Sequence, residues 1–97
     1  MRLRYTRRVL QDISEIADYI HTENPQAAER VRAAILDSLQ LLTRFPRIGR
    51  LTTVSGVRKL VTRKYPYLVY YEIDDEAGEV VLLTVQHPAR DRAISDS

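Results

Sequence analysis

The side chains of this sequence that could act on an anionic substrate are basic residues of its second half and one histidine. Cleaving RNA beside a 2′-hydroxyl needs a base for that proton, cations for the phosphate and an acid for the leaving oxygen. Arg58 and Arg63 could stabilise the phosphate, and His87 could transfer a proton. A carboxylate base is missing, because no acidic residue occurs between Arg44 and Tyr71. The set for RNA cleavage is therefore incomplete.

The same cations could instead form a surface that binds a partner. Such a surface needs an excess of positive charge and no group that transfers protons. Residues 44–64 carry seven basic side chains, whereas the acids collect in the predicted helices and in the turn at residues 74–79. The cations that flank the last strands and the tail, and that we predict to bind a target, are Arg63, Lys64, Arg90 and Arg92. Each could equally be a solvated surface charge.

The composition excludes several kinds of site. The chain has no cysteine, so it has no disulfide, no thiolate nucleophile and no cysteine metal site. His21 and His87 lie far apart with no ligand pattern around them, so we expect neither metal nor cofactor. No stretch is long and apolar enough to span a bilayer, and the N-terminus has no apolar signal segment. These features favour a cytoplasmic protein without a membrane partner.

The periodicity of the apolar residues predicts how these side chains are positioned. With 97 residues, the chain is expected to form a single domain, residues 1–97. Thr6 and Asn24-Pro25 are helix-start signals, and the short link between the helices predicts an antiparallel hairpin. The strands are expected at residues 2–5, 57–63, 67–73 and 80–85, and the helices at residues 7–21 and 25–44. The prediction is an α+β domain, β-α-α-β-β-β, with the helical hairpin packed on one face of a small, mainly antiparallel sheet.

The second face of this sheet is where we expect a partner. Two helices can cover only one face, and both long strands are apolar on nearly every residue. The side chains expected to face the helices are Val69, Tyr71, Ile73, Val81, Leu83 and Val85. Those expected to form an exposed apolar strip are Leu68, Tyr70, Val80 and Leu82. Such a strip on a small protein marks a partner site. The polar tail, residues 89–97, could become ordered only against a partner.

Four short motifs follow one another along the chain in this order of elements. They are Glu23-Asn24-Pro25, Phe45-Pro46-x-x-Gly49-Arg50, Tyr65-Pro66-Tyr67 and His87-x-Ala89-Arg90. Together with the order of elements they resemble the RelE/ParE superfamily of toxins from bacterial type II toxin–antitoxin modules. The resemblance covers nearly the whole chain. The helical hairpin and the His-x-Ala-Arg ending are more similar to the ParE branch than to the RelE branch.

The resemblance implies an antitoxin partner, which wraps the toxin with an extended, partly helical segment that folds on binding. Its expected contacts are the apolar strip and Arg58. A ParE-like protein would inhibit DNA gyrase by binding, without catalysis. A RelE-like protein would be a ribosome-dependent mRNA endonuclease that uses Arg58, Arg63 and His87, although a full catalytic set cannot be matched. A third reading is a non-toxic member of the family that survives only as a binding module.

Overall fold

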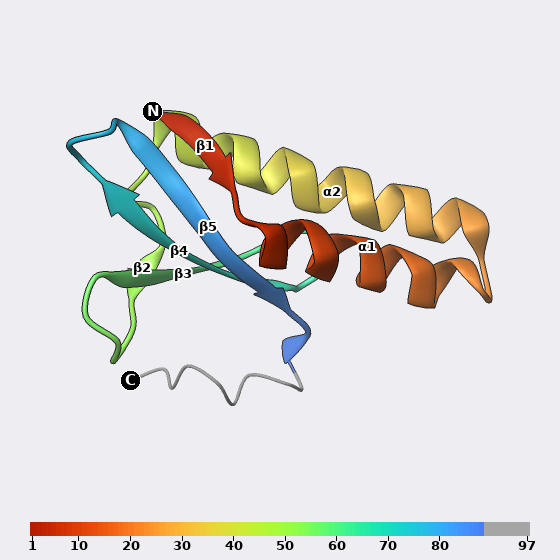
Figure 1. Ribbon diagram of the computed structural model, residues 1–97. Helices are drawn as coiled ribbons and strands as arrows, with labels where there is room; N and C mark the ends of the chain where they lie inside the picture. Colours follow the sequence, from red (N-terminus) through yellow and green to blue (C-terminus); the bar gives the residue numbers. More distant parts are fainter. Residues whose placement is uncertain (89–97) are drawn as a thin grey trace.

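The chain folds into a five-stranded sheet with an antiparallel pair of helices on one side (Figure 1). The computed structural model describes residues 1–88. The elements are β1 (Arg2–Tyr5), α1 (Arg7–His21), α2 (Pro25–Arg44), β2 (Arg50–Leu51), β3 (Val57–Val61), β4 (Leu68–Asp74) and β5 (Glu79–Gln86). In the sheet the strands lie in the order β1-β5-β4-β3-β2, with β1 parallel to β5 and the other neighbours antiparallel. The predicted α+β architecture is confirmed, and the short edge strand β2 is an addition to it.

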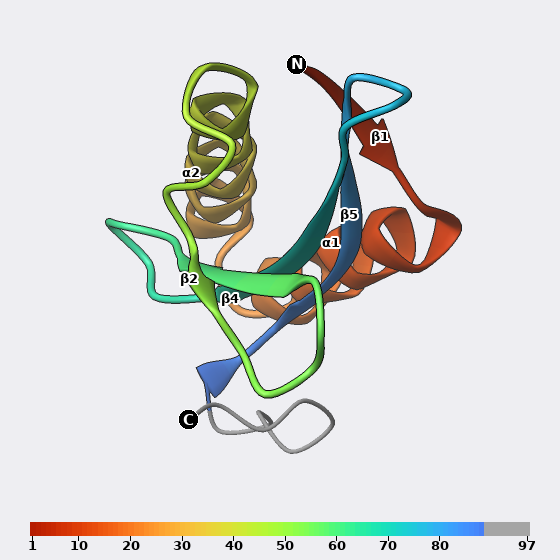
Figure 2. The same ribbon diagram turned by 90° about the vertical axis from the view of Figure 1, so that its left-hand side faces the viewer.

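Both helices begin where their capping residues predict. The hydroxyl of Thr6 accepts a hydrogen bond from the backbone N–H of Val9 at 3.2 Å. The side chain of Asn24 accepts one from the N–H of Ala27 at 3.1 Å, and Pro25 occupies the first turn of α2. The hairpin that follows lies along the sheet and projects beyond its end (Figure 1). Figure 2 looks down α2 and shows the strands curving past it, with α1 partly behind β5.

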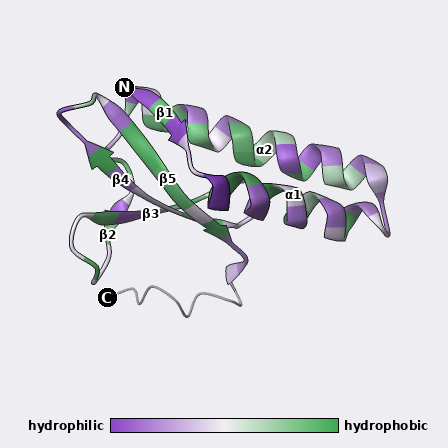
Figure 3. Cartoon of the chain, in the orientation of Figure 1, coloured by the Kyte–Doolittle hydropathy of each residue, from purple (hydrophilic) through white to green (hydrophobic). Residues whose placement is uncertain are grey.

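The main core fills the space between the helices and the sheet. In Figure 3, β5 is hydrophobic along most of its length, whereas the helices alternate between hydrophobic and hydrophilic positions. The buried residues of this core are Val9, Ile13, Val31, Ile35, Leu39, Leu42, Val69, Tyr71, Val80, Leu82 and Val85. The outer faces of the helices are left to charged side chains, as their apolar spacing predicts.

A β-bulge sets the direction of the side chains in β5. Tyr70 pairs with Thr84, but the next residue, Tyr71, pairs with Leu82. Leu83 is therefore an extra residue with no opposite partner in β4, which is the definition of a bulge. An extra residue reverses the alternation of side chains on its two sides. The strict alternation expected from the sequence cannot hold along this strand.

The prediction of an exposed apolar strip is wrong, for Val80 and Leu82 because of this bulge and for Leu68 and Tyr70 because they form a second cluster. Val80 and Leu82 point into the helix-facing core, and each is 0% exposed. Leu68 and Tyr70 do lie outside that core, but they pack with Val57 in a second small cluster and are 6% and 0% exposed. All four residues of the predicted strip are buried, whereas Arg58, the fifth predicted antitoxin contact, is half-buried. The strip is therefore not exposed on this protein, and the contacts of an antitoxin stay a prediction.

Asp12 of α1 ties the first helix to the bulged strand. Its carboxylate accepts hydrogen bonds from the hydroxyl of Thr84 at 2.6 Å and from the N–H of Val85 at 3.0 Å. Arg8, one turn earlier on α1, donates to the other carboxylate oxygen at 3.3 Å. The Asp12 side chain is only 13% exposed. One charged group thus satisfies two polar groups of β5 just after its bulge.

Neither helix within residues 1–88 has both the length and the apolar character needed to cross a membrane.

Candidate functional site

One end of the sheet gathers three of the predicted target-binding or catalytic residues. Leu68 pairs with Gln86, so the turn before β4 and the residues after β5 meet there. The ring of Tyr67 meets the ring of His87 edge-on, with the centroids 5.8 Å apart. Thr62 fixes the turn, because its hydroxyl donates to the carbonyl of Tyr65 and accepts from the N–H of Tyr67. We call this region, residues 62–67 with His87, the basic end of the sheet.

The basic end of the sheet presents cations and hydrogen-bond donors. Arg63 and Lys64 are both exposed, and the Lys64 ammonium lies 6.0 Å from the centroid of the Tyr65 ring. Burial raises the pKa of Tyr67 above its usual value, so its phenol stays protonated at neutral pH. It can donate a hydrogen bond but is a poor base. Among the described residues, no cluster of three or more histidine, aspartate or glutamate side chains could hold a metal ion.

Arg58 does not join the basic end of the sheet. Its guanidinium lies under the loop after α2, where one nitrogen donates to the carbonyl oxygens of Gly49 at 2.7 Å and Arg47 at 3.3 Å. These bonds give Arg58 a structural task. The structure therefore brings Arg63 and His87 to the same end of the sheet but leaves the third residue of the predicted nuclease set away from them.

Tyr71 holds the same loop from below. Its hydroxyl donates to the carbonyl of Pro46 at 2.8 Å and accepts from the N–H of Gly49 at 2.8 Å. Burial raises the pKa of Tyr71, while the hydrogen bond from Gly49 and the charge of Arg58 lower it by less. The phenol therefore keeps the proton that it donates. A Cβ on residue 49 would lie 2.6 Å from this hydroxyl, so only glycine fits there.

Lys59 is a residue whose position the sequence did not distinguish. It was one cation of a basic segment, but the structure places it beside Tyr70 in the sheet, with Arg50 on its other side. Its side chain and backbone together are only 9% exposed, which is unusual for lysine. The alternation of Val57 and Lys59 on one face of β3 was the signal that could have indicated this. Arg90 and Arg92 lie outside the described residues, and their predicted role is untested.

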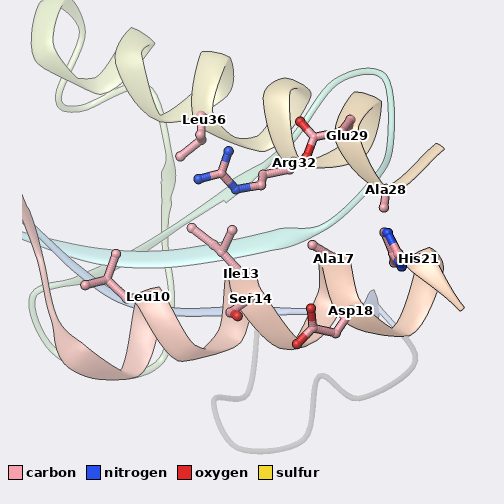
Figure 4. Close-up of a pocket in the computed structure, with 10 residues that line it drawn as sticks. All are labelled: Leu10, Ile13, Ser14, Ala17, Asp18, His21, Ala28, Glu29, Arg32 and Leu36. Carbon is pink, nitrogen blue, oxygen red and sulfur yellow. The ribbon is translucent and has the colours of Figure 1, made fainter. Parts of the chain in front are cut away.

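A groove between α1 and α2 was not predicted at all. It encloses a hollow of about 330 Å³. Its floor is apolar and its rim is polar; the lining residues are Leu10, Ile13, Ser14, Ala17, Asp18, His21, Ala28, Glu29, Arg32 and Leu36. Figure 4 shows Arg32 and Leu36 reaching from α2 toward Ile13 of α1, with the small side chains of Ala17 and Ala28 beside them. These alanines leave the space that larger side chains would fill.

Comparison with known proteins places this chain in a family. The family model described as "ParE toxin of type II toxin-antitoxin system, parDE" matches residues 3–92, which is nearly the whole chain. The chain belongs to the ParE toxin family. The family membership that the four sequence motifs implied is thereby confirmed, within the wider RelE/ParE superfamily.

Two curated relatives of this ParE-family chain are toxins by name, and one of the two names is of the RelE branch. "Putative toxin Y4kP" of Sinorhizobium fredii is 37% identical over 86 residues, which cover 89% of this chain and 86% of that protein. "Toxin RelE2" of Caulobacter vibrioides is 35% identical over 86 residues, covering 89% of this chain and 93% of that protein. Both matches extend over almost the whole domain. The family model is of ParE whereas one relative is named RelE2, so relatedness alone does not assign a molecular target.

Solved structures share the fold of this ParE-family chain. The chromosomal ParDE system of P. aeruginosa superimposes with a TM-score of 0.79 at 23% identity, covering 90% of this chain and 95% of that one. The intact RelBE toxin–antitoxin complex of E. coli gives 0.68 at 21% identity, with 92% and 98% covered. The RelBE2 complex of Mycobacterium tuberculosis gives 0.61 at 29% identity, with 89% and 95% covered.

Proposed function

We propose that this ParE-family toxin inhibits DNA gyrase by binding and is neutralised by a cognate antitoxin. The observation that carries the proposal is the placement of Arg58, whose guanidinium is used to hold the loop at Gly49 and Arg47. Phosphate cleavage needs its cations and proton donors to converge on one atom. Inhibition by binding needs only a presented surface. The match to the ParE family favours the same choice, and a cytoplasmic location goes with it.

The surface that would meet the target is the basic end of the sheet. Arg63 and Lys64 are exposed on a turn fixed by Thr62, so they are held out from the body of the sheet. Cations in this position attract the acidic groups of a gyrase–DNA complex and speed its encounter with the toxin. Arg90 and Arg92 follow this region in the sequence and belong to the same proposal.

A supercoiling assay tests this proposal. Purified toxin should inhibit supercoiling by gyrase, and the double variant Arg63→Ala/Lys64→Ala should require roughly tenfold more protein, because two interfacial charges are lost. The matched control is Arg7→Ala/Arg30→Ala, which removes two exposed cations from the helices and should inhibit like the wild type. No inhibition by wild-type toxin at several-fold excess over gyrase would refute the proposal.

A ribosome-dependent mRNA endonuclease is the second candidate. The observation that favours it is the meeting of Arg63, His87 and a protonated Tyr67 at one end of the sheet. Mapping of mRNA ends after induction distinguishes the two functions. An endonuclease of this kind cuts the mRNA at the ribosomal A site, and a gyrase inhibitor does not. Unimpaired growth on induction without the antitoxin would instead support the third reading, a non-toxic binding module.

The antitoxin would dock in the groove between α1 and α2 rather than on the sheet strip. The ParDE and RelBE structures that share this fold are toxin–antitoxin systems, and two of them are solved complexes by title. An amphipathic helix fits such a groove when its apolar side chains enter the hollow beside Ala17 and Ala28. An acidic residue of that helix could pair with Arg32 on the rim.

Filling the groove should separate antitoxin binding from folding. Ala17→Phe places a ring in the hollow, and we expect at least a tenfold loss of antitoxin affinity in calorimetry, because the docking side chain is displaced. Ala33→Phe is the matched control, since Ala33 is exposed on α2 outside the groove. Equal affinity of both variants would show that the antitoxin binds elsewhere.

A further inference from the structure

The loop after α2 exposes apolar side chains although its backbone is held rigidly. Phe45, Ile48 and Leu51 are 53%, 52% and 56% exposed. The side chains of residues 45–48 surround a shallow hollow of about 380 Å³. Leu51 pairs with Arg58 in the sheet, and Arg58 is the residue whose guanidinium lies under this loop. We call Phe45, Ile48 and Leu51 the apolar platform.

The rigidity of the loop comes from side chains of the sheet. Tyr71 binds the loop at Pro46 and Gly49, and Arg58 binds its carbonyls at Arg47 and Gly49. Side chains of the sheet thus make four hydrogen bonds to the backbone of this loop. A loop that only connects two elements does not need so many. A preorganised loop that presents large apolar side chains to solvent has the properties of a binding surface, because little conformational entropy is lost when it binds.

The charges around the platform indicate what binds there. The guanidinium of Arg44 lies 5.7 Å from the centroid of the Phe45 ring, and Arg47 pairs with Asp75 in an exposed ion pair at 3.3 Å. The sequence contains no acid from residue 38 to residue 71. Arg47 is already paired, whereas Arg44 is exposed beside Phe45, and an apolar centre with this cation at its edge complements an apolar segment that carries an acidic residue.

We propose that the apolar platform is a second docking surface for the target protein and binds an acidic, apolar segment of it. The inference rests on the proposed function, because it names a surface through which the target is bound. A protein segment is favoured over nucleic acid, since Ile48 and Leu51 gain nothing from a phosphate backbone and offer no ring for base stacking. Phe45 and Ile48 are of the size that anchors protein interfaces.

The platform is separate from the groove assigned to the antitoxin. Leu36, the last groove residue on α2, and Phe45 are nine positions apart, which is about 14 Å along a helix at 1.5 Å per residue. An antitoxin helix seated beside Ala17 and Ala28 need not cover the platform. Substitution of the platform is therefore expected to affect the target and leave the antitoxin complex intact.

The test compares Ile48→Asp and Phe45→Gln with the control Val54→Asp. Val54 is 43% exposed in the loop between β2 and β3 and lies outside the hollow. We expect each platform variant to need roughly 30-fold more protein than wild type for half-inhibition of gyrase, as for loss of an interface anchor. Val54→Asp should behave as wild type. Unchanged thermal melting and antitoxin affinity show that the fold is intact, and unchanged inhibition by both platform variants overturns the inference.

Growth arrest after induction separates this inference from the proposed function. If wild-type toxin stops growth but does not inhibit gyrase, the gyrase proposal fails; relief of the arrest by Ile48→Asp then supports the platform, and a persistent arrest overturns it. A wild type that does not arrest growth overturns both. Loss of antitoxin affinity in Ile48→Asp, or loss of binding to a DNA fragment without gyrase, would assign the platform to the antitoxin or to nucleic acid and also overturn the inference.

Discussion

Replacing Gly49 with alanine is expected to lower the free energy of unfolding by about 3 kcal/mol. A Cβ there would lie 2.6 Å from the hydroxyl and 2.8 Å from Cε1 of Tyr71, and 2.9 Å from the carbonyl oxygen of Lys59. Neither neighbour yields easily, because Tyr71 is fully buried and the other atom belongs to the backbone of a central strand. The loop must move away, and its hydrogen bonds with the phenol are lost.

Thermal and urea melts measure this loss, and for a domain of this size it amounts to a fall in melting temperature of roughly 15 °C. Tyr71→Phe removes the phenol oxygen, so it destabilises the protein but relieves the closest clash. The loss of stability in the double variant Gly49→Ala/Tyr71→Phe should therefore be smaller than the sum of the losses in the two single variants. Full additivity would mean that the clash with the hydroxyl is not the cause.

Replacing Asp12 with alanine is the second change with a large expected effect, again about 3 kcal/mol. The hydroxyl of Thr84 and the N–H of Val85 would lose their charged acceptor, while both residues are buried at 7% and 3% exposure. An unsatisfied donor in such a place keeps its full desolvation cost. Chemical denaturation of the variant measures the loss.

Asp12→Asn should lose about half as much, because an amide oxygen in the place of Oδ2 can still accept both bonds but carries no charge. The control is Glu15→Ala on the same helix, whose carboxylate is exposed and accepts a hydrogen bond from the Gln11 amide. Its substitution should change stability by less than about 0.5 kcal/mol. A loss in Glu15→Ala equal to that in Asp12→Ala would assign the effect to helix charge rather than to the bond with β5.

Local signals were sufficient to predict the helices and the order of elements. Thr6 and Asn24 cap helices through hydrogen bonds to residues three positions later, so their effect is contained within one turn of sequence. Which side chains of β5 face the helices was not predictable in this way. Leu83 became a bulge in a strand that Asp12 binds from α1, more than seventy residues away along the chain. A contact of that range leaves no trace in the local alternation.

The environments of the basic residues were equally hidden. Arg58, Lys59 and Arg63 lie within six positions in the sequence, yet one holds a loop, one is almost buried in the sheet and one is exposed on a turn. Arg58 and Lys59 are successive residues of β3, so their side chains point to opposite faces of the sheet. Arg63 lies beyond the end of this strand. The groove between the helices depends on how closely α1 and α2 approach at Ala17 and Ala28, which residue types alone do not determine.

The position of β5 also has a consequence for synthesis of the protein. Among residues 1–88 the first strand, β1, pairs only with β5, and Arg2 lies opposite Glu79. β5, which is synthesised after the other described elements, is thus inserted between β1 and β4, and it supplies Val80, Leu82 and Val85 to the core beneath the helices. A nascent chain that ends before residue 79 has no partner for its N-terminal strand and an unfilled core. We therefore expect the toxin to acquire its structure only after β5 has been synthesised, so that synthesis interrupted before this strand releases no folded toxin.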